Sequence, residues 1–298
     1  MKKYLLLVFT CLFINTAHSQ EKTKFEKYDA FVRCAMIQYK NQNYKGALEN
    51  FEKAFKIIPD ELVNDYFYAA AAALHLNENE KAKELIIKSI IKTDSAIDYL
   101  LSFEEFNPFR SLKLFEEINT NYETYRLAFY ENLEFPEIYT EIRLMIDKDQ
   151  EVRINGGDMD SVDTPNIIRL IEITKKCGWQ ERSWLLLWHQ RMEFGEDNYV
   201  WSFFKPYIDE QIRIGEMRKD FWARFEEDKS IELTGKQIYG FWWSQYDEMP
   251  LLDIQNVDKR RDAVGMTPMW FDEKIYGIKP PTDYKITEES KHFINCSQ

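Results

Sequence analysis

The chain has 298 residues, of which 45% are hydrophobic and 15% aromatic, so it carries enough apolar material for one large or two modest cores. Its 39 lysine and arginine residues stand against 51 aspartate and glutamate residues, a formal net charge of −12. This acidic balance argues against nucleic acid or an anionic membrane surface as a partner.

The first 19 residues have the pattern of a secretory signal peptide. Lys2 and Lys3 precede an apolar stretch over residues 5–14. The small residues Ala17 and Ser19 then occupy the −3 and −1 positions of a signal-peptidase cleavage site after Ser19. That stretch is well short of the roughly 20 residues that a membrane-spanning helix needs, and no later segment reaches that length without charges. We therefore expect an exported chain, periplasmic or extracellular, with no transmembrane segment.

Three cysteines, Cys34, Cys177 and Cys296, remain after the predicted cleavage. Their odd number and wide spacing argue against a dense disulfide framework and leave at least one thiol unpaired, and the sequence does not show whether two of them form a bridge. There is no CxxC pair, and only three histidines follow the signal peptide. We therefore expect no metal site and no cofactor.

Residues 20–133 contain a helical-hairpin repeat with an offset of 35 residues. Small residues let two helices approach closely, large residues fill the groove between hairpins, and an asparagine-rich turn reverses the chain. The repeat positions Phe31, Ala35, Ala47, Phe51, Ala54 and Pro59 align with Tyr66, Ala70, Ala82, Ile86, Ser89 and Asp94. The first unit resembles a tetratricopeptide repeat (TPR), whereas the second lacks the closing proline and has Ile86 in place of an aromatic residue.

A third helical layer is expected over residues 98–130, where apolar side chains recur and Pro108 can start a helix. Because terminal repeats depart from the consensus, this layer would cap the solenoid. The TPR resemblance implies a concave face that binds an extended peptide or a partner protein. The alternative is that the hairpins only brace the region that follows.

The second region, residues 134–279, is also expected to be largely helical, with residues 280–298 as a C-terminal tail. A glycine-rich break at 155–158 separates its first two helices, and Asp163 can cap the second of these, with Pro165 in its first turn. The predicted fold class is therefore mostly α, a short TPR-like hairpin solenoid followed by a second helical domain. Further helices are expected over 182–192, 199–214, 221–227 and, last, 256–264, with a short extended or buried segment at 238–243.

Short motifs follow one another in a fixed order between residues 140 and 271. They are Met145-x-x-x-Asp149-Gln150-x-x-Arg153, Asp163-x-x-Asn166, Gly178-Trp179, a leucine-rich stretch ending at His189, Gly215-Glu216, Gln237-x-Tyr239-Gly240 and Val257-Asp258-Lys259-Arg260-Arg261-x-x-Val264-Gly265. Together they resemble DUF6624, a bacterial domain family of unknown function, which has no established activity to transfer. The order and spacing of the motifs carry the resemblance.

The chain departs from that family pattern where the family has polar groups. Trp188 stands in place of a glutamine before the histidine, Glu227-Asp228 in place of Asp-Arg, and Phe241-Trp242 in place of Thr-Gln. If the family uses those groups in a catalytic site, this chain has lost that site or binds something more apolar.

The candidate catalytic residues are Asp149, His189 and Arg153. Asp149 and Arg153 are four apart, so on a helix they form an ion pair. One interpretation places them around a pocket with His189, Gln237 and Tyr239, where Arg153 holds an anionic group and Asp149 or His189 handles a proton. The competing interpretation is a solvated helix face beside a buried, hydrogen-bonded structural histidine.

Other polar and aromatic residues have a functional and a structural interpretation too. Glu193, four residues after His189, could orient the imidazole or share a metal. Arg260 and Arg261 fit an anion site, but also a salt bridge that locks the domain. The tryptophans between 184 and 270 could stack on a sugar or peptide, although scattered aromatic residues usually form core.

Three functional hypotheses remain open. The first is an exported binding or scaffold protein whose TPR-like hairpins bind a protein or peptide partner. The second is a hydrolase-type enzyme with a pocket around Asp149, Arg153 and His189. The third is small-ligand or carbohydrate binding by tryptophans, which requires at least two indole faces in one cleft. The ligand-binding candidates are Gln237, Tyr239, Arg260 and Arg261, and the sequence does not indicate the oligomeric state.

Overall fold

The computed structural model describes residues 22–59 and 62–296, and within them the regular secondary structure is helical. The β-type pairing in this part of the chain is an isolated parallel bridge between Gln237 and Leu251. The mostly α fold class is thus confirmed. The predicted signal peptide, residues 1–19, lies outside the described residues. No helix of the described ranges is both long enough and apolar enough to span a bilayer.

Two helical hairpins open the described chain, as the repeat predicts. Gln42 and Asn77, 35 positions apart, have φ values of 61° and 62°, so the repeat extends to the backbone of the two turns. Asn43 begins the second helix by accepting a hydrogen bond from the backbone amide of Gly46. The hairpin helices are α1 (Lys24–Lys40), α2 (Tyr44–Ile57), α3 (Val63–His75) and α4 (Asn79–Thr93).

Most of the repeat positions are buried between the hairpin helices, whereas Phe31 and Asp94 are partly exposed and Pro59 is exposed. Ala47, Phe51 and Ala54 are fully buried, as are Ala82 and Ile86 in the second unit. The expected third layer packs onto this core through buried phenylalanines. Pro108, which was expected to start a helix in this layer, lies inside the 3-10 helix η1 instead. The layer consists of α5 (Ile97–Ser102), η1 (Glu104–Phe109), α6 (Lys113–Thr120) and α7 (Tyr122–Glu131).

The second region begins with two long antiparallel helices and continues with shorter ones. Asp163 is not the cap of the second long helix, because that helix begins three residues earlier, at Asp160. The segment expected to be one helix over 182–192 consists of a 3-10 turn, a short α-helix and a second 3-10 turn. His189 directly follows the short α-helix, as its C-cap. The elements are α8 (Pro136–Asn155), α9 (Asp160–Cys177), η2 (Glu181–Ser183), α10 (Trp184–Trp188), η3 (Arg191–Glu193), α11 (Tyr199–Arg213), η4 (Lys219–Trp222) and α12 (Ala223–Thr234).

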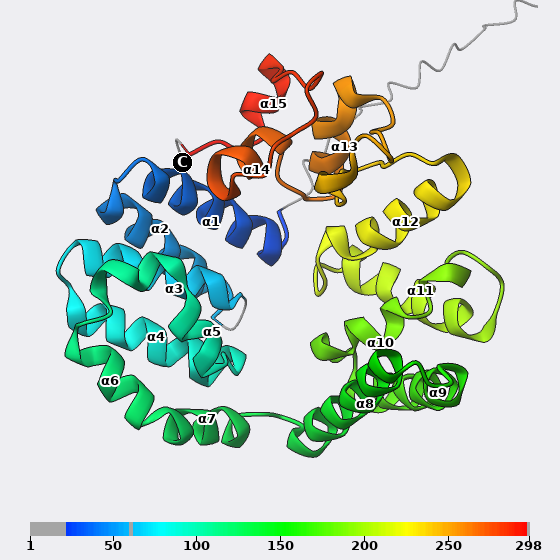
Figure 1. Ribbon diagram of the computed structural model, residues 1–298, viewed down its shortest axis with the longest axis horizontal. Coiled ribbons are helices and arrows are strands. Elements are labelled where there is room, and N and C mark those ends of the chain that lie inside the picture. The colour runs from blue at the N-terminus through cyan, green and yellow to red at the C-terminus, as the bar shows by residue number, and fades with distance from the viewer. Residues whose placement is uncertain (1–21, 60–61, 297–298) are drawn as a thin grey trace, which may run out of the picture.

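The C-terminal helices return to the beginning of the described chain. Helix α13 (Val257–Ala263) matches the helix expected at 256–264 but is not the last, since α14 (Met269–Tyr276) and α15 (Glu288–His292) follow. Phe271 of α14 is part of the hairpin core, and Cys34 of α1 forms a disulfide with Cys296. Figure 1 shows the result, a ring of helices in which α14 lies beside α1. Disulfides of this kind are typical of oxidising compartments.

One junction between the two regions is organised by Asp94, the left-handed residue that ends α4. Its carboxylate is 7% exposed and accepts a hydrogen bond from the Tyr139 hydroxyl at 2.6 Å. Arg182 lies 3.3 Å away, Arg126 3.4 Å and Arg143 3.8 Å. Three arginines from three elements thus converge on one nearly buried carboxylate.

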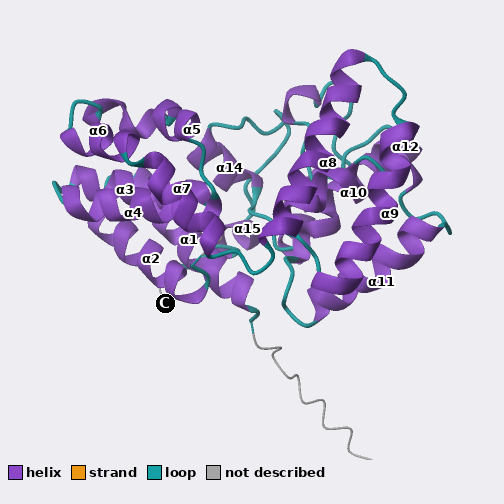
Figure 2. Ribbon diagram, turned by 90° about the horizontal axis from the view of Figure 1, so that it is seen from below, coloured by secondary structure: helices purple, strands orange, loops and turns teal. Residues whose placement is uncertain are grey.

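The second junction joins α1 to the segment between α11 and α12. Arg218 donates two hydrogen bonds to the carboxylate of Asp29, at 2.7 and 2.8 Å, and Lys219 lies 2.5 Å from Glu26. Together with the first junction, these contacts close the hairpin helices onto α8–α12, which Figure 2 shows as two facing groups.

Candidate functional site

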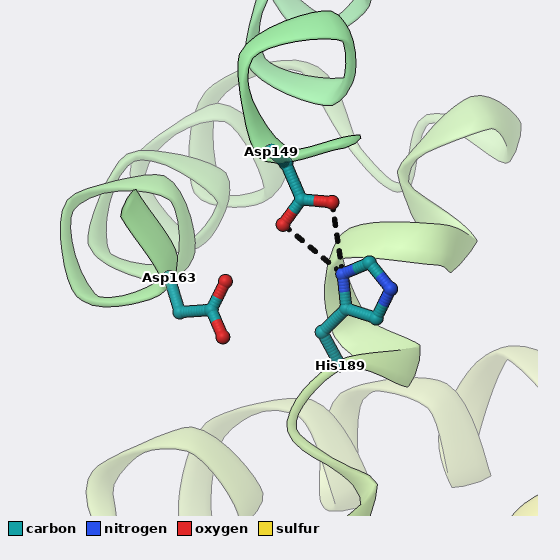
Figure 3. Close-up of side chains that lie close together, drawn as sticks. All are labelled: Asp149, Asp163 and His189. Atoms are coloured by element: carbon teal, nitrogen blue, oxygen red, sulfur yellow. Dashed lines mark hydrogen bonds and ion pairs between the residues drawn. The ribbon is translucent and has the colours of Figure 1, made fainter. Parts of the chain in front are cut away.

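The structure brings the three catalytic candidates together. Asp149 lies on α8 with 1% of its side chain exposed, and the Nδ1 atom of His189 lies 3.0 Å from its carboxylate (Figure 3). Arg153, one turn along α8, donates to Oδ1 of the same carboxylate at 2.8 Å. The predicted Asp149–Arg153 ion pair therefore forms, in a buried setting and not on a solvated face.

Two further residues complete this histidine cluster, which comprises Asp149, Gln150, Arg153, Asp163 and His189. Arg153 reaches across to α9, where both carboxylate oxygens of Asp163 accept from it at 2.8 and 2.9 Å. Gln150 donates to Asp149 at 2.8 Å. One guanidinium thus holds two carboxylates, and one of these holds the imidazole.

The cluster sets both the orientation and the charge of the imidazole. Burial lowers the pKa of His189, although the Asp149 carboxylate opposes this shift. Its second ring nitrogen points away from both carboxylates (Figure 3). Glu193 does not orient the ring, contrary to one expectation, because its carboxylate accepts a hydrogen bond from Asn198. An imidazole that is fixed by a carboxylate and whose neutral form is favoured by burial has the form of a general base.

The same residues have some features of a metal site. One ligand atom each from Asp149, Asp163 and His189 lie within 4.8 Å of one another. However, Arg153 already pairs with both carboxylates at hydrogen-bonding distance, and a cation would have to displace its guanidinium. This donor set therefore suits an ion pair better than a metal.

Gln237 and Tyr239 lie in a different place, a loop organised by Glu227. The fully buried Glu227 carboxylate accepts hydrogen bonds from four consecutive backbone amides, those of residues 238–241, at 2.5 to 2.9 Å. Gln237 is occupied by backbone groups of Trp242 and Met249. The segment expected to be extended or buried is therefore a loop wrapped around a buried carboxylate, and sequence reasoning missed the role of Glu227.

The two candidate arginines also hold backbone segments in place. Arg260 donates to the carbonyl oxygens of Ile238, Leu252 and Asp253. Arg261 donates to the carbonyl oxygens of Tyr239 and Thr267 at 2.6 Å and forms an ion pair with Asp272. These contacts fit the salt-bridge interpretation of this pair, and they fix the Glu227 loop against α13 and α14.

A cavity of about 700 Å³ lies where the hairpins face the second region, and we call it the central cavity. Phe25 of α1 and Leu62, directly before α3, line it on the side of the hairpins, and residues between 178 and 241 line the rest. None of the histidine cluster lines it. Its aromatic lining consists of Phe25, Trp179, Trp184, Tyr207, Phe221 and Phe241, and its charged lining includes Glu181, Glu216, Arg218, Asp220 and Arg224.

A second cavity of about 380 Å³ adjoins the first, because Leu62, Arg218, Asp220 and Phe241 line both. Burial raises the pKa of the Asp220 carboxyl, with Arg218 opposing the shift. Phe241, whose amide is held by Glu227, thus forms a wall of both cavities, which connects the buried carboxylate to the shape of the central cavity.

Polar atoms that are buried without a hydrogen-bond acceptor among the described residues include the Nε1 atom of Trp179 and the Nε atom of Arg224, and both residues line the central cavity. Each such group costs about 1–3 kcal/mol relative to a satisfied one. Unsatisfied polar groups are few in native proteins, and a bound ligand, ion or water is one explanation for each of them. The sequence held no signal for them, since the cavity collects residues from distant segments.

No protein-family model matches the chain, and no curated protein or solved structure matches it either. The resemblances to TPR and DUF6624 accordingly stay predictions. Function is therefore inferred from the geometry of the histidine cluster and of the central cavity.

Proposed function

We propose that the protein is an exported binding protein that holds a small organic ligand in the central cavity. The observation that carries this proposal is the aromatic lining, in which Trp179 and Trp184 both contribute to one cavity. Small-ligand binding by tryptophans requires at least two indoles in the same cleft, and this cavity has two. Sites for small molecules typically measure about 300–1,000 Å³, lie between domains and combine apolar walls with a few polar groups.

The packing of α14 bears on the alternative of peptide binding by the hairpins. Phe271 and Ile275 of α14 are buried in the hairpin core, and Tyr276 lines the smaller cavity with Asp65 of α3. A peptide bound there would compete with a helix of the same chain. A protein or peptide partner remains a prediction, but the central cavity offers a better-formed site.

Thermal denaturation of the exported, mature protein in the presence of a metabolite and carbohydrate library tests the proposal. Ligands that stabilise the wild-type protein should no longer stabilise Trp184→Ala or Phe241→Ala. They should still stabilise Leu233→Ala, a control whose side chain is 70% exposed and lines neither cavity. If no compound stabilises the wild-type protein, or if Trp184→Ala and Phe241→Ala respond as the wild type does, the cavity is not the site.

The oriented imidazole supports a second candidate, a hydrolase that uses His189 as general base with Asp149 holding the ring. Ester, amide and phosphate substrates would be assayed with the wild type, His189→Asn and Asp149→Asn. Activity that both variants reduce at least 100-fold would favour the enzyme. Activity that neither variant reduces would assign the histidine cluster to structure.

A further inference from the structure

Arg224 is a charged residue of the central cavity for which the described residues provide no hydrogen-bond or ion-pair partner. Its guanidinium lies 5.4, 5.6 and 5.2 Å from the ring centroids of Trp188, Phe241 and Trp242. It forms no hydrogen bond or ion pair with any residue of the described chain, and its Nε atom is buried. Arg218, which lines the same cavity, is held by Asp29.

An unpaired guanidinium is unexpected in a protein with a net charge of −12. Taking a cation partly out of water is unfavourable unless an opposite charge or a hydrogen-bond acceptor replaces the solvent. Aromatic faces compensate for only part of that loss. Arg224 is therefore preorganised by its three rings and lacks only an acceptor, which a ligand oxyanion would supply.

The surroundings of Arg224 favour an anion with a single charge. Asp220 precedes it by four residues and lines the same cavity, yet no ion pair within 4 Å joins the two among the described contacts. Glu181 and Glu216 line the cavity as well. A dianion such as a phosphate monoester would be repelled by these carboxylates, whereas a carboxylate carries half its charge.

We propose that the central cavity binds a monocarboxylate with a flat apolar body. The outer N–H groups of Arg224 take the carboxylate, and the indole of Trp184 takes the apolar face. This inference rests on the proposed function and narrows its ligand to one chemical class.

Matched pairs of compounds test the role of the charge. The pairs are phenylacetate and phenylacetamide, indole-3-acetate and indole-3-acetamide, and 4-hydroxybenzoate and 4-hydroxybenzamide, with phenyl phosphate as the dianion. Dissociation constants would be measured by saturation-transfer NMR and calorimetry on the mature protein. At least one carboxylate should bind about tenfold or more tightly than its amide, as expected for a charge-assisted hydrogen bond, and phenyl phosphate no better than the amides.

Two variants separate Arg224 from its neighbours. Arg224→Met keeps the length of the side chain and should abolish the preference for the carboxylate while the amide binds as before. Arg191→Gln is the matched control, because Arg191 also stacks on Trp188, at 4.6 Å, but pairs with Asp228 and lines neither cavity. It should keep the preference. Should Arg224→Met fail to fold, Arg224→Lys, which keeps the charge and loses the planar fork, should weaken the preference.

The outcomes are distinguishable. Equal affinities within every pair, a preference that survives in Arg224→Met or is undiminished in Arg224→Lys, or tighter binding of phenyl phosphate would overturn the inference and leave the proposed function standing. Failure of every compound to bind would also overturn the monocarboxylate assignment. The proposed function would fall as well if the broad library in thermal denaturation gave no ligand.

Discussion

Replacing Glu227 by glutamine tests how the chain builds the wall of the central cavity. The carboxylate is fully buried and accepts four backbone N–H groups, from Ile238, Tyr239, Gly240 and Phe241. A glutamine has nearly the same shape. Its amide oxygen can keep two of these bonds, but its NH₂ group then faces the two remaining N–H donors.

The magnitude follows from that count. Two hydrogen bonds to a charged group contribute roughly 1.5–3 kcal/mol each, and part of this is offset because a neutral amide is less costly to bury than a carboxylate. We expect Glu227→Gln to lower the free energy of unfolding by about 3 kcal/mol. The loop that carries Phe241 should loosen as well, so that hydrogen exchange of its amides becomes faster.

Urea denaturation of the mature protein measures the effect. Glu226→Gln is the matched control, because Glu226 neighbours the site but accepts one hydrogen bond, from the Tyr239 hydroxyl at 2.6 Å. Its cost should stay within about 1 kcal/mol. Equal stabilities of the two variants would refute the argument that the buried carboxylate organises the loop.

Three further predictions concern the ring of helices and its histidine. Asp94→Ala should lower the free energy of unfolding by roughly 2–3 kcal/mol in urea denaturation, which is less than the loss of a fully buried ion pair would cost, because the arginines around Asp94 are about a third exposed. Asp94→Asn should lower the free energy of unfolding by less, and equal losses in the two variants would contradict the charge argument. Cys34→Ser opens a disulfide that spans 262 residues and should cost about 2–5 kcal/mol, so an unchanged melting temperature would show that the bridge contributes little. Burial lowers the pKa of His189, so the unfolded chain binds the proton more tightly than the folded protein does. The wild type should therefore lose stability relative to His189→Asn as the pH falls below about 6.5. A stability difference between the two proteins that is constant between pH 5 and 8 would contradict this.

The hairpins could be predicted because their determinants are local. Small and large residues recur every 35 positions, and the structure buries them where the repeat requires, down to the left-handed turns at Gln42 and Asn77. The packing of α14 onto α1 could not be predicted in this way. Phe271 shares the hairpin core with Met36 of α1, which lies 271 − 36 = 235 positions earlier in the sequence.

The candidate site was predictable in its helical part only. Asp149 and Arg153 are one turn apart, so their contact follows from helix geometry. The approach of His189 depends on how α10 packs on α8, and periodicity carries no information on that packing. For the same reason the unpaired Arg224 gave no signal, because an arginine is recognisable as partnerless only once its surroundings are known.

The central claim is that a small organic ligand binds in the central cavity, and the tryptophan indole N–H signals test it most directly. In ¹⁵N-labelled mature protein, ligand titration should shift the signals of Trp179 and Trp184, which line the cavity. The signal of Trp201 should stay in place, since its Nε1 is also buried and unsatisfied but belongs to the core and lines neither cavity. Unchanged signals of Trp179 and Trp184 at saturating ligand would contradict the claim.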